Sequence, residues 1–405
     1  MTISMKMKPA EFIALSACTM ALTALGIDIM LPAFAALRTE FGLSHESTET
    51  SKIISFFFMG QIAQLIFGIL SDRYGRLAIL RLGFPLYIVC GLIAAFAPNL
   101  EVMLAARFLA GVGASAVFMT TIASVRDRFV GNQMARIMSL IFTIFLFTPV
   151  LAPFAGAAIL HVFSWKAVFL TPPLFAMIVF VWSLRLEESL PKEKRIPPDW
   201  KSISRTVKSV LSNRVFLRYT AITTMLFTAL SSYVSSSEHI IGDIYKRPDL
   251  FVWVFAGGGL AASLCTLLNS KLSSRYGARV VIKWLLCFYS LASAALLINT
   301  IVFGDPPFMP VFFTAIALLL GLNLAVEPNS SALALEPLGN AAGIASSLYG
   351  TSFFFIGAGL GSLISHFLRS NILPLVLSFF VLGLIATFLA FTDPRARTAA
   401  APGKA

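Results

Sequence analysis

Charged residues are scarce in this sequence. Only 12% of its 405 residues are Asp, Glu, Lys or Arg, whereas 58% are hydrophobic. A soluble globular domain usually carries about 25% charged residues, so these polar groups could not cover a folded surface on all sides. The composition therefore argues against an ordinary soluble protein and favours an integral membrane protein.

Cysteine and histidine are rare as well, at four residues each. The cysteines lie in apolar segments without a Cys-x-x-Cys pair, which argues against a disulfide framework or a metal centre. A phosphate-binding loop of the Gly-x-x-x-x-Gly-Lys type is missing, so the sequence gives no support for ATP-driven work. Since no nucleophilic triad is recognisable either, we predict neither an enzyme nor a bound cofactor or metal.

Long apolar runs are abundant. They fall near residues 12–34, 53–70, 79–97, 102–124, 138–160, 167–184, 216–236, 251–268, 280–302, 311–334, 343–367 and 372–391. Each is about as long as a helix needs to be to cross a bilayer, and each is too long and continuous for a barrel strand. The sequence predicts an all-α integral membrane protein with twelve transmembrane helices.

The distribution of basic residues predicts the orientation. The net charge is +12, yet the basic residues form no patch interleaved with aromatic side chains outside the apolar runs, so we do not expect nucleic acid as a partner. Most of the 31 lysines and arginines fall in segments on the same side as the N-terminus. Because cytoplasmic loops are enriched in Lys and Arg, we expect both termini in the cytoplasm.

A polar, basic segment divides the chain. It reads RLEESLPKEKRIPPDWKSISRTVKSVLSNR and separates six apolar runs from six others. We predict a bundle of residues 1–184, a linker of 185–215, a second bundle of 216–392 and a cytoplasmic tail of 393–405. From about Trp200 to Leu211 the linker has the pattern of an amphipathic helix on the membrane surface, although a solvated tether explains it equally well.

A short repeat supports this division. DRYGR begins at Asp72 and SRYGA begins at Ser274, and both lie between the second and third spans of their half. Equal placement favours a duplicated unit, and hence two pseudo-symmetric six-helix bundles.

The first span contains an acid, Asp28, followed by Pro32. A charged residue at the centre of a membrane helix costs about 2.5–3.5 kcal/mol, so such residues usually face the interior of a bundle. Arg107, in the fourth span, is predicted at a matching depth. Two interpretations remain open: a carboxyl group that binds and releases a proton while Arg107 tunes it, or a fixed ion pair that holds two helices together.

Other polar residues inside the spans are candidates for a substrate site or a second proton site. Glu327 precedes Pro328 midway along the tenth span, and Asn323 lies one turn away. Gln61 and Gln64 lie one turn apart in the second span. For all four, a local hydrogen bond or a solvated position is an equally acceptable explanation.

The loop after the second span carries a specific motif, Gly-x-Leu-x-Asp-Arg-x-Gly-Arg. It comprises Gly68, Asp72, Arg73, Gly75 and Arg76. With this motif the chain resembles the major facilitator superfamily. The resemblance implies that the loop acts as a conformational latch, and we expect Asp72 to bridge to a cytoplasmic arginine such as Arg126 in one transport state. A static loop is the alternative explanation.

Further stretches narrow the resemblance to twelve-span drug:proton antiporters of the Bcr/CflA and MdfA type. They are GIDIMLPAF, RFLAGVGAS, TPVLAPFAGAAIL and PNSSALALEPLGNAAGIASSLYG. The third of these contains Pro149, Pro153 and Gly156, the fifth-span antiporter motif. The resemblance implies the major facilitator fold, a monomer in the bacterial inner membrane, and a site in which Asp28 matches the family's first-span acid.

We therefore expect a proton-coupled antiporter that exports small lipophilic or cationic compounds by alternating access. Its partners would be the substrate, protons and the lipid bilayer. Three alternatives stay open: a dedicated exporter of one metabolite or siderophore, proton-coupled uptake of a nutrient, and a membrane receptor or enzyme that transports nothing.

Overall fold

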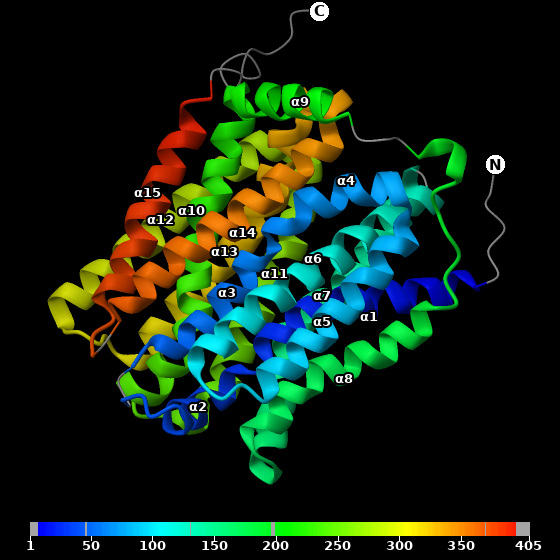
Figure 1. Cartoon of the computed structure of the whole chain (residues 1–405). Helices are drawn as coiled ribbons and strands as arrows, with labels where there is room; N and C mark the ends of the chain where they lie inside the picture. Colours follow the sequence, from blue (N-terminus) through cyan, green and yellow to red (C-terminus); the bar gives the residue numbers. More distant parts are fainter. Residues whose placement is uncertain (1–6, 45–46, 130, 196–198, 369, 394–405) are drawn as a thin grey trace, which may run out of the picture. The chain divides into compact units, whose positions relative to one another are not determined.

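The computed structural model describes residues 7–44, 47–129, 131–195, 199–368 and 370–393. The predicted tail, apart from Asp393, lies outside these residues. The described segments are helices joined by turns, and none of them contains a strand (Figure 1). The predicted all-helical fold is confirmed.

Among the described residues, eleven helical segments are long and apolar enough to cross a membrane. The seventh predicted span coincides with α10 (Arg214–His239), which has the required length but is too polar to be among the eleven. Its sequence is rich in Ser and Thr, and some of their hydroxyl groups hydrogen-bond to carbonyls of the same helix, as Thr224 does to Thr220 at 2.8 Å. Such local bonds allow polar residues within a span.

Contacts between Cα atoms divide the chain into two units. Unit 1 comprises Met1–Ile203 and Ser235–Ala256, and unit 2 comprises Ser204–Val234 and Gly257–Ala405. The end of α10 and the turns after it thus group with the first unit. The predicted bundle boundaries, which place the whole seventh span in the second half, stay a prediction. The predicted amphipathic segment of the linker is helical, as α9 (Trp200–Ser212).

Unit 1 is built from closely packed helices. They are α1 (Pro9–Asp28), α2 (Phe34–Glu40), α3 (Lys52–Gly60), α4 (Gln64–Tyr74), α5 (Arg76–Ala95), α6 (Leu100–Arg128), α7 (Gly131–Val162) and α8 (Trp165–Ser183). Helix α6 is central, because α3, α4 and α5 all pack against it (Figure 1). At Gly111 a Cβ atom would collide with the carbonyl oxygen of Phe57, so only glycine lets α6 approach α3 this closely.

Two spans of unit 1 are interrupted. The first changes from α1 to the short 3-10 helix η1 (Leu31–Ala33), which contains Pro32, and then to α2. The second changes from α3 to α4 through η3 (Gln61–Ala63). Proline explains the first break, since it has no N–H to continue the helical hydrogen bonds.

Unit 2 contains most of α9, most of α10 and five further helices. They are α11 (Phe251–Tyr276, from Gly257 onward), α12 (Ala278–Phe303), α13 (Met309–Leu335), α14 (Ala342–His366) and α15 (Leu373–Phe391). Helix α12 packs between α13 and α15. The rings of Tyr289 and Phe379 stack at 6.2 Å where α12 meets α15, which fixes these helices through buried aromatic area.

Candidate functional site

Asp28 is the last residue of α1 and is buried within unit 1. The helix ends here because Pro32 cannot donate the next helical hydrogen bond. Among the residues that the structure describes, none donates a hydrogen bond to the Asp28 carboxyl group and none forms an ion pair with it. A buried carboxyl group without a partner is costly when it is ionised, so this arrangement favours the neutral, protonated form.

Arg107 lies on α6 and is also fully buried. Its Nη2 donates to the carbonyl oxygen of Gly26 at 2.5 Å and its Nε to that of Ile53 at 3.5 Å. The guanidinium lies over the ring of Phe57, 4.4 Å from the centroid. The structure thus brings Arg107 to the turn of α1 that bears Asp28 but does not pair the two charges, and it does not contain the fixed ion pair that the sequence left open.

Helix α7 closes the other side of this turn. At Gly156, a member of the antiporter motif, a Cβ atom would collide with the carbonyl oxygen of Ile29. Glycine at this position therefore lets α7 contact the backbone directly after Asp28. Pro153 lies about one turn earlier in the same helix, and Pro149 about two turns earlier. The motif is adjacent to the acid, although the two were identified separately in the sequence.

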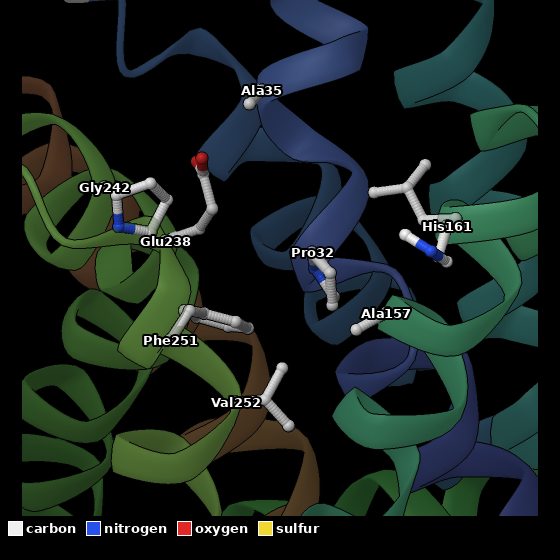
Figure 2. Close-up of a pocket in the computed structure, with 10 residues that line it drawn as sticks. Pro32, Ala35, Ala157, His161, Glu238, Gly242, Phe251 and Val252 are labelled. Carbon is white, nitrogen blue, oxygen red and sulfur yellow. The ribbon is translucent and has the colours of Figure 1, made fainter.

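A pocket of about 370 Å³ lies nearby in unit 1. Glu238 and His161 lie on opposite sides of it, with Pro32 and Ala157 between them (Figure 2). Apolar side chains supply much of the remaining lining, among them Phe251 and Val252. The pocket combines an apolar wall with few polar groups, as sites for small molecules commonly do.

A buried ion cluster beside this pocket was not predictable from the motifs of the sequence. Arg38 is only 2% exposed; it donates to Glu238 at 2.7 and 3.0 Å and to Asp243 at 2.7 Å. His239 Nδ1 lies 2.9 Å from the Asp243 carboxylate. Burial alone would raise the pKa of Asp243, but the hydrogen bond from His239 and the charge of Arg38 outweigh it and hold that pKa below its ordinary value.

The signature loop between α4 and α5 is also held by ion pairs. Gly75, with φ of +97°, makes the turn that ordinary residues rarely adopt. Arg76 then donates to Asp72 at 2.5 Å and to Asp127 at 2.8 Å. Arg73 is exposed and lies over the ring of Tyr74 instead. Gly68 lies one turn before Asp72, and its carbonyl accepts a hydrogen bond from the hydroxyl of Ser71.

The expected partner of Asp72 was different. Arg126 is exposed and forms no bridge to Asp72 in this structure, in which Arg76 takes that place and also reaches Asp127. Glu188, from the start of the linker, accepts hydrogen bonds from the backbone N–H groups of Arg76 and Leu77 at 2.9 and 3.2 Å. This carboxylate also lies at the N-terminus of α5, where the positive end of the helix dipole stabilises a negative charge.

The remaining sequence candidates separate into different environments. Gln61 donates to the Gly111 carbonyl at 3.4 Å and accepts from Gln64 at 3.1 Å, so both glutamines satisfy local needs between α3, α4 and α6. Asn323 donates to the Leu226 carbonyl at 2.6 Å within unit 2. Glu327 has no such partner among the described residues.

The comparison with protein-family models decides the family. The model described as Major Facilitator Superfamily matches residues 16–362. The chain belongs to the major facilitator superfamily. As members of this superfamily are membrane transporters, the twelve-span fold and the role as a multi-pass transporter of small molecules follow from this assignment.

Two relatives match this major facilitator chain over most of their length. The Bicyclomycin resistance protein homolog of Haemophilus influenzae is 27% identical over 87% of this chain and 88% of its own. The Uncharacterized MFS-type transporter YdgK of Bacillus subtilis is 29% identical over 84% and 85%. A solved structure, that of the human organic anion transporter MFSD10, has a TM-score of 0.71 and 18% identity over 95% of this chain and 100% of that one, which supports the fold alone.

Proposed function

We propose that this chain exports small lipophilic or cationic compounds across the bacterial inner membrane in exchange for protons. The observation that carries the proposal is the Asp28 carboxyl group, buried at the end of an interrupted helix without a hydrogen-bond or ion-pair partner among the described residues. A group in this position gains a proton readily and requires a change of surroundings to lose it. Proton exchange would therefore be linked to conformation.

The relatives support the choice of cargo. One is named for resistance to bicyclomycin, a small drug, and aligns with nearly the whole of this chain. Resistance by a membrane transporter of this family is most simply explained by export of the drug. The apolar lining of the pocket in unit 1 is compatible with lipophilic cargo.

In the proposed cycle, Asp28 is deprotonated while cargo is captured from the cytoplasmic side. Protonation of Asp28 from the outside then favours release of cargo and return. Arg107 would assist because it is anchored on the Gly26 carbonyl, two residues before the acid, where it can stabilise the carboxylate once the helices move. One proton moving inward across 100 mV contributes about 2.3 kcal/mol, enough to bias a cycle with weakly bound cargo.

The signature loop would act as the latch of this cycle. Arg76 connects the end of α4 with the end of α6 through Asp72 and Asp127, and Glu188 adds the linker to the same contact. Several charge-assisted bonds on one guanidinium form together or break together, as a two-state element requires.

The test is proton-driven flux in proteoliposomes with chloramphenicol as an uncharged cargo. Asp28→Asn keeps the shape of the side chain and removes its titration. We expect it to lose at least nine-tenths of pH-driven flux while cargo still exchanges across the membrane without a gradient. Asp249→Asn, which changes an exposed acid of the same unit, is the matched control and should transport normally. Unchanged pH-driven flux in Asp28→Asn would refute the assignment.

A further inference from the structure

Glu327 occupies an unusual place in unit 2. It lies in the C-terminal half of α13, directly before Pro328, and its side chain is half-buried. No cation among the described residues lies within ion-pair distance of its carboxylate. The proline also leaves the carbonyl of Leu324 without its helical donor. A carboxylate and a free carbonyl thus lie one turn apart on one helix.

Hydrogen bonds between helices hold this region of unit 2 together. Asn323 donates to the Leu226 carbonyl at 2.6 Å on the N-terminal side of Glu327. On its C-terminal side, Ser330 donates to the carbonyl of Tyr219 at 2.7 Å. Both bonds join α13 to α10, so the acid is supported by the neighbouring helix on both sides. A site supported in this way loses less entropy when a ligand binds.

Helix α14 brings a tyrosine to the acid. The hydroxyl of Tyr349 lies 3.5 Å from the backbone carbonyl of Glu327 and 2.7 Å from the hydroxyl of Thr223 on α10. The tyrosine ring is therefore fixed beside the acid by contacts with two helices.

Aromatic rings continue from Tyr349 in an unbroken series. Phe353 is 5.5 Å from Tyr349, and Phe227 on α10 is 5.2 Å from Phe353, measured between ring centroids. Phe354 is 5.1 Å from Phe227. The three phenylalanines are partly exposed.

This chemistry selects one class of ligand. Organic cations bind over aromatic faces through the ring quadrupole, and the attraction increases when both groups are desolvated. A single carboxylate neutralises one positive charge, whereas hard metal ions require six or more oxygen ligands. Partly exposed rings accommodate an apolar body. A monovalent cation with aromatic or aliphatic bulk therefore fits all three features.

We infer that Glu327, with the rings of Tyr349, Phe353 and Phe227, forms a subsite in unit 2 for monovalent lipophilic cations. This inference rests on the proposed function, since it specifies the cargo that the exporter selects. The subsite is separate from Asp28: the acid of unit 1 would exchange the proton, and the acid of unit 2 would bind the charge of the cargo.

Equilibrium binding tests the inference without a proton gradient. The probes are tetraphenylphosphonium, a cation, and triphenylphosphine oxide, an uncharged molecule with the same rings, both titrated at fixed pH into detergent-solubilised full-length protein. For Glu327→Gln we expect about a tenfold loss of affinity for the cation and less than a twofold change for the neutral probe. Glu327→Asp should recover part of the cation affinity, because it restores the charge.

The control is Glu336→Gln. Glu336 also precedes a proline, nine residues further along the chain, but it is exposed and paired with Arg279. Its replacement should leave the ratio of cation to neutral affinity unchanged. Equal losses for both probes in Glu327→Gln would indicate a structural role and overturn the inference, as would an unchanged cation affinity. The two proposals can fail independently. The binding assay with Glu327→Gln tests the cation subsite, whereas the flux assay with Asp28→Asn tests proton coupling.

Discussion

Arg107 donates to the carbonyl oxygen of Gly26 at 2.5 Å rather than to the carboxyl group of Asp28 two residues further on. The guanidinium is thereby anchored to the helix that bears the acid without neutralising it. A fixed ion pair would keep Asp28 ionised, which would prevent proton exchange. The observed arrangement keeps the positive charge on the same stretch of α1 without an ion pair to the carboxyl group.

Replacement of Arg107 by lysine should reduce transport. A lysine ammonium cannot reach the Gly26 and Ile53 carbonyls and cover the Phe57 ring together, as the planar guanidinium does. We expect pH-driven flux in proteoliposomes to fall about tenfold or more. Arg126→Lys on the same helix is the control, because Arg126 is exposed. Equal flux in both variants would show that the anchor is dispensable.

Gly111→Ala should destabilise unit 1. The added methyl group would meet the carbonyl oxygen of Phe57, which belongs to the backbone of α3 and cannot turn aside. Overpacking of this kind costs about 1–3 kcal/mol, and thermal unfolding of the purified protein should begin several degrees lower. Gly257→Ala, where nothing lies within 4 Å of the added atom, should leave the unfolding temperature unchanged or raise it.

The two acids that bind Arg76 should contribute unequally. The side chain of Asp127 is 19% exposed and that of Asp72 is 57% exposed. Asp127→Asn weakens a partly buried charge-assisted bond and should cost about 1–3 kcal/mol, whereas Asp72→Asn should cost less than about 1 kcal/mol. Chemical denaturation followed by tryptophan fluorescence can rank the two variants. A larger effect for Asp72→Asn would contradict the observed hydrogen bonding.

The cluster around Arg38 predicts a dependence of stability on pH. The pKa of Asp243 is held below its ordinary value of about 3.9, so its ionised form stabilises the folded protein above that pH. This contribution disappears as the pH falls through the lower, folded-state pKa. The groups that act on it are Arg38, His239, Lys246 and Glu238.

Asp243→Asn should therefore lower the unfolding temperature at pH 7, and the difference from the parent protein should shrink toward pH 3. Thermal scans across that range measure the effect. A deficit that does not change with pH would mean that packing, not charge, is responsible. Lys246→Gln, a change of charge at an exposed turn near the same acid, should have a smaller effect at pH 7.

The sequence predicted features that depend on neighbouring residues along the chain. The apolar runs gave the spans because hydrocarbon demands continuous helices of a minimum length. Pro32 marked the end of α1 at Asp28, and Gly75 marked the turn of the signature loop. These are local consequences of backbone chemistry, and a single sequence contains them.

Pairings between distant residues were not predictable in the same way. Arg38 and Glu238 are 200 positions apart, and their contact depends on how two helices are rotated. Rotation about a helix axis also decides that Arg76 meets Asp127 and that Arg126 faces outward. A nearly uniform apolar span carries little information on its rotation. Arg38 and Glu238 each lie close to the end of an apolar run, and this placement was the only indication in the sequence that the two charges pair.

The polarity of α10 has a consequence for how the protein is made. A protein-conducting channel releases a segment into lipid according to its apolarity. Helix α10 contains nine Ser and Thr residues, and all nine are buried in the folded protein. Such a segment gains little by entering lipid alone. We expect α10 to enter the membrane together with adjoining segments. It would therefore stay at the channel until those segments have been made.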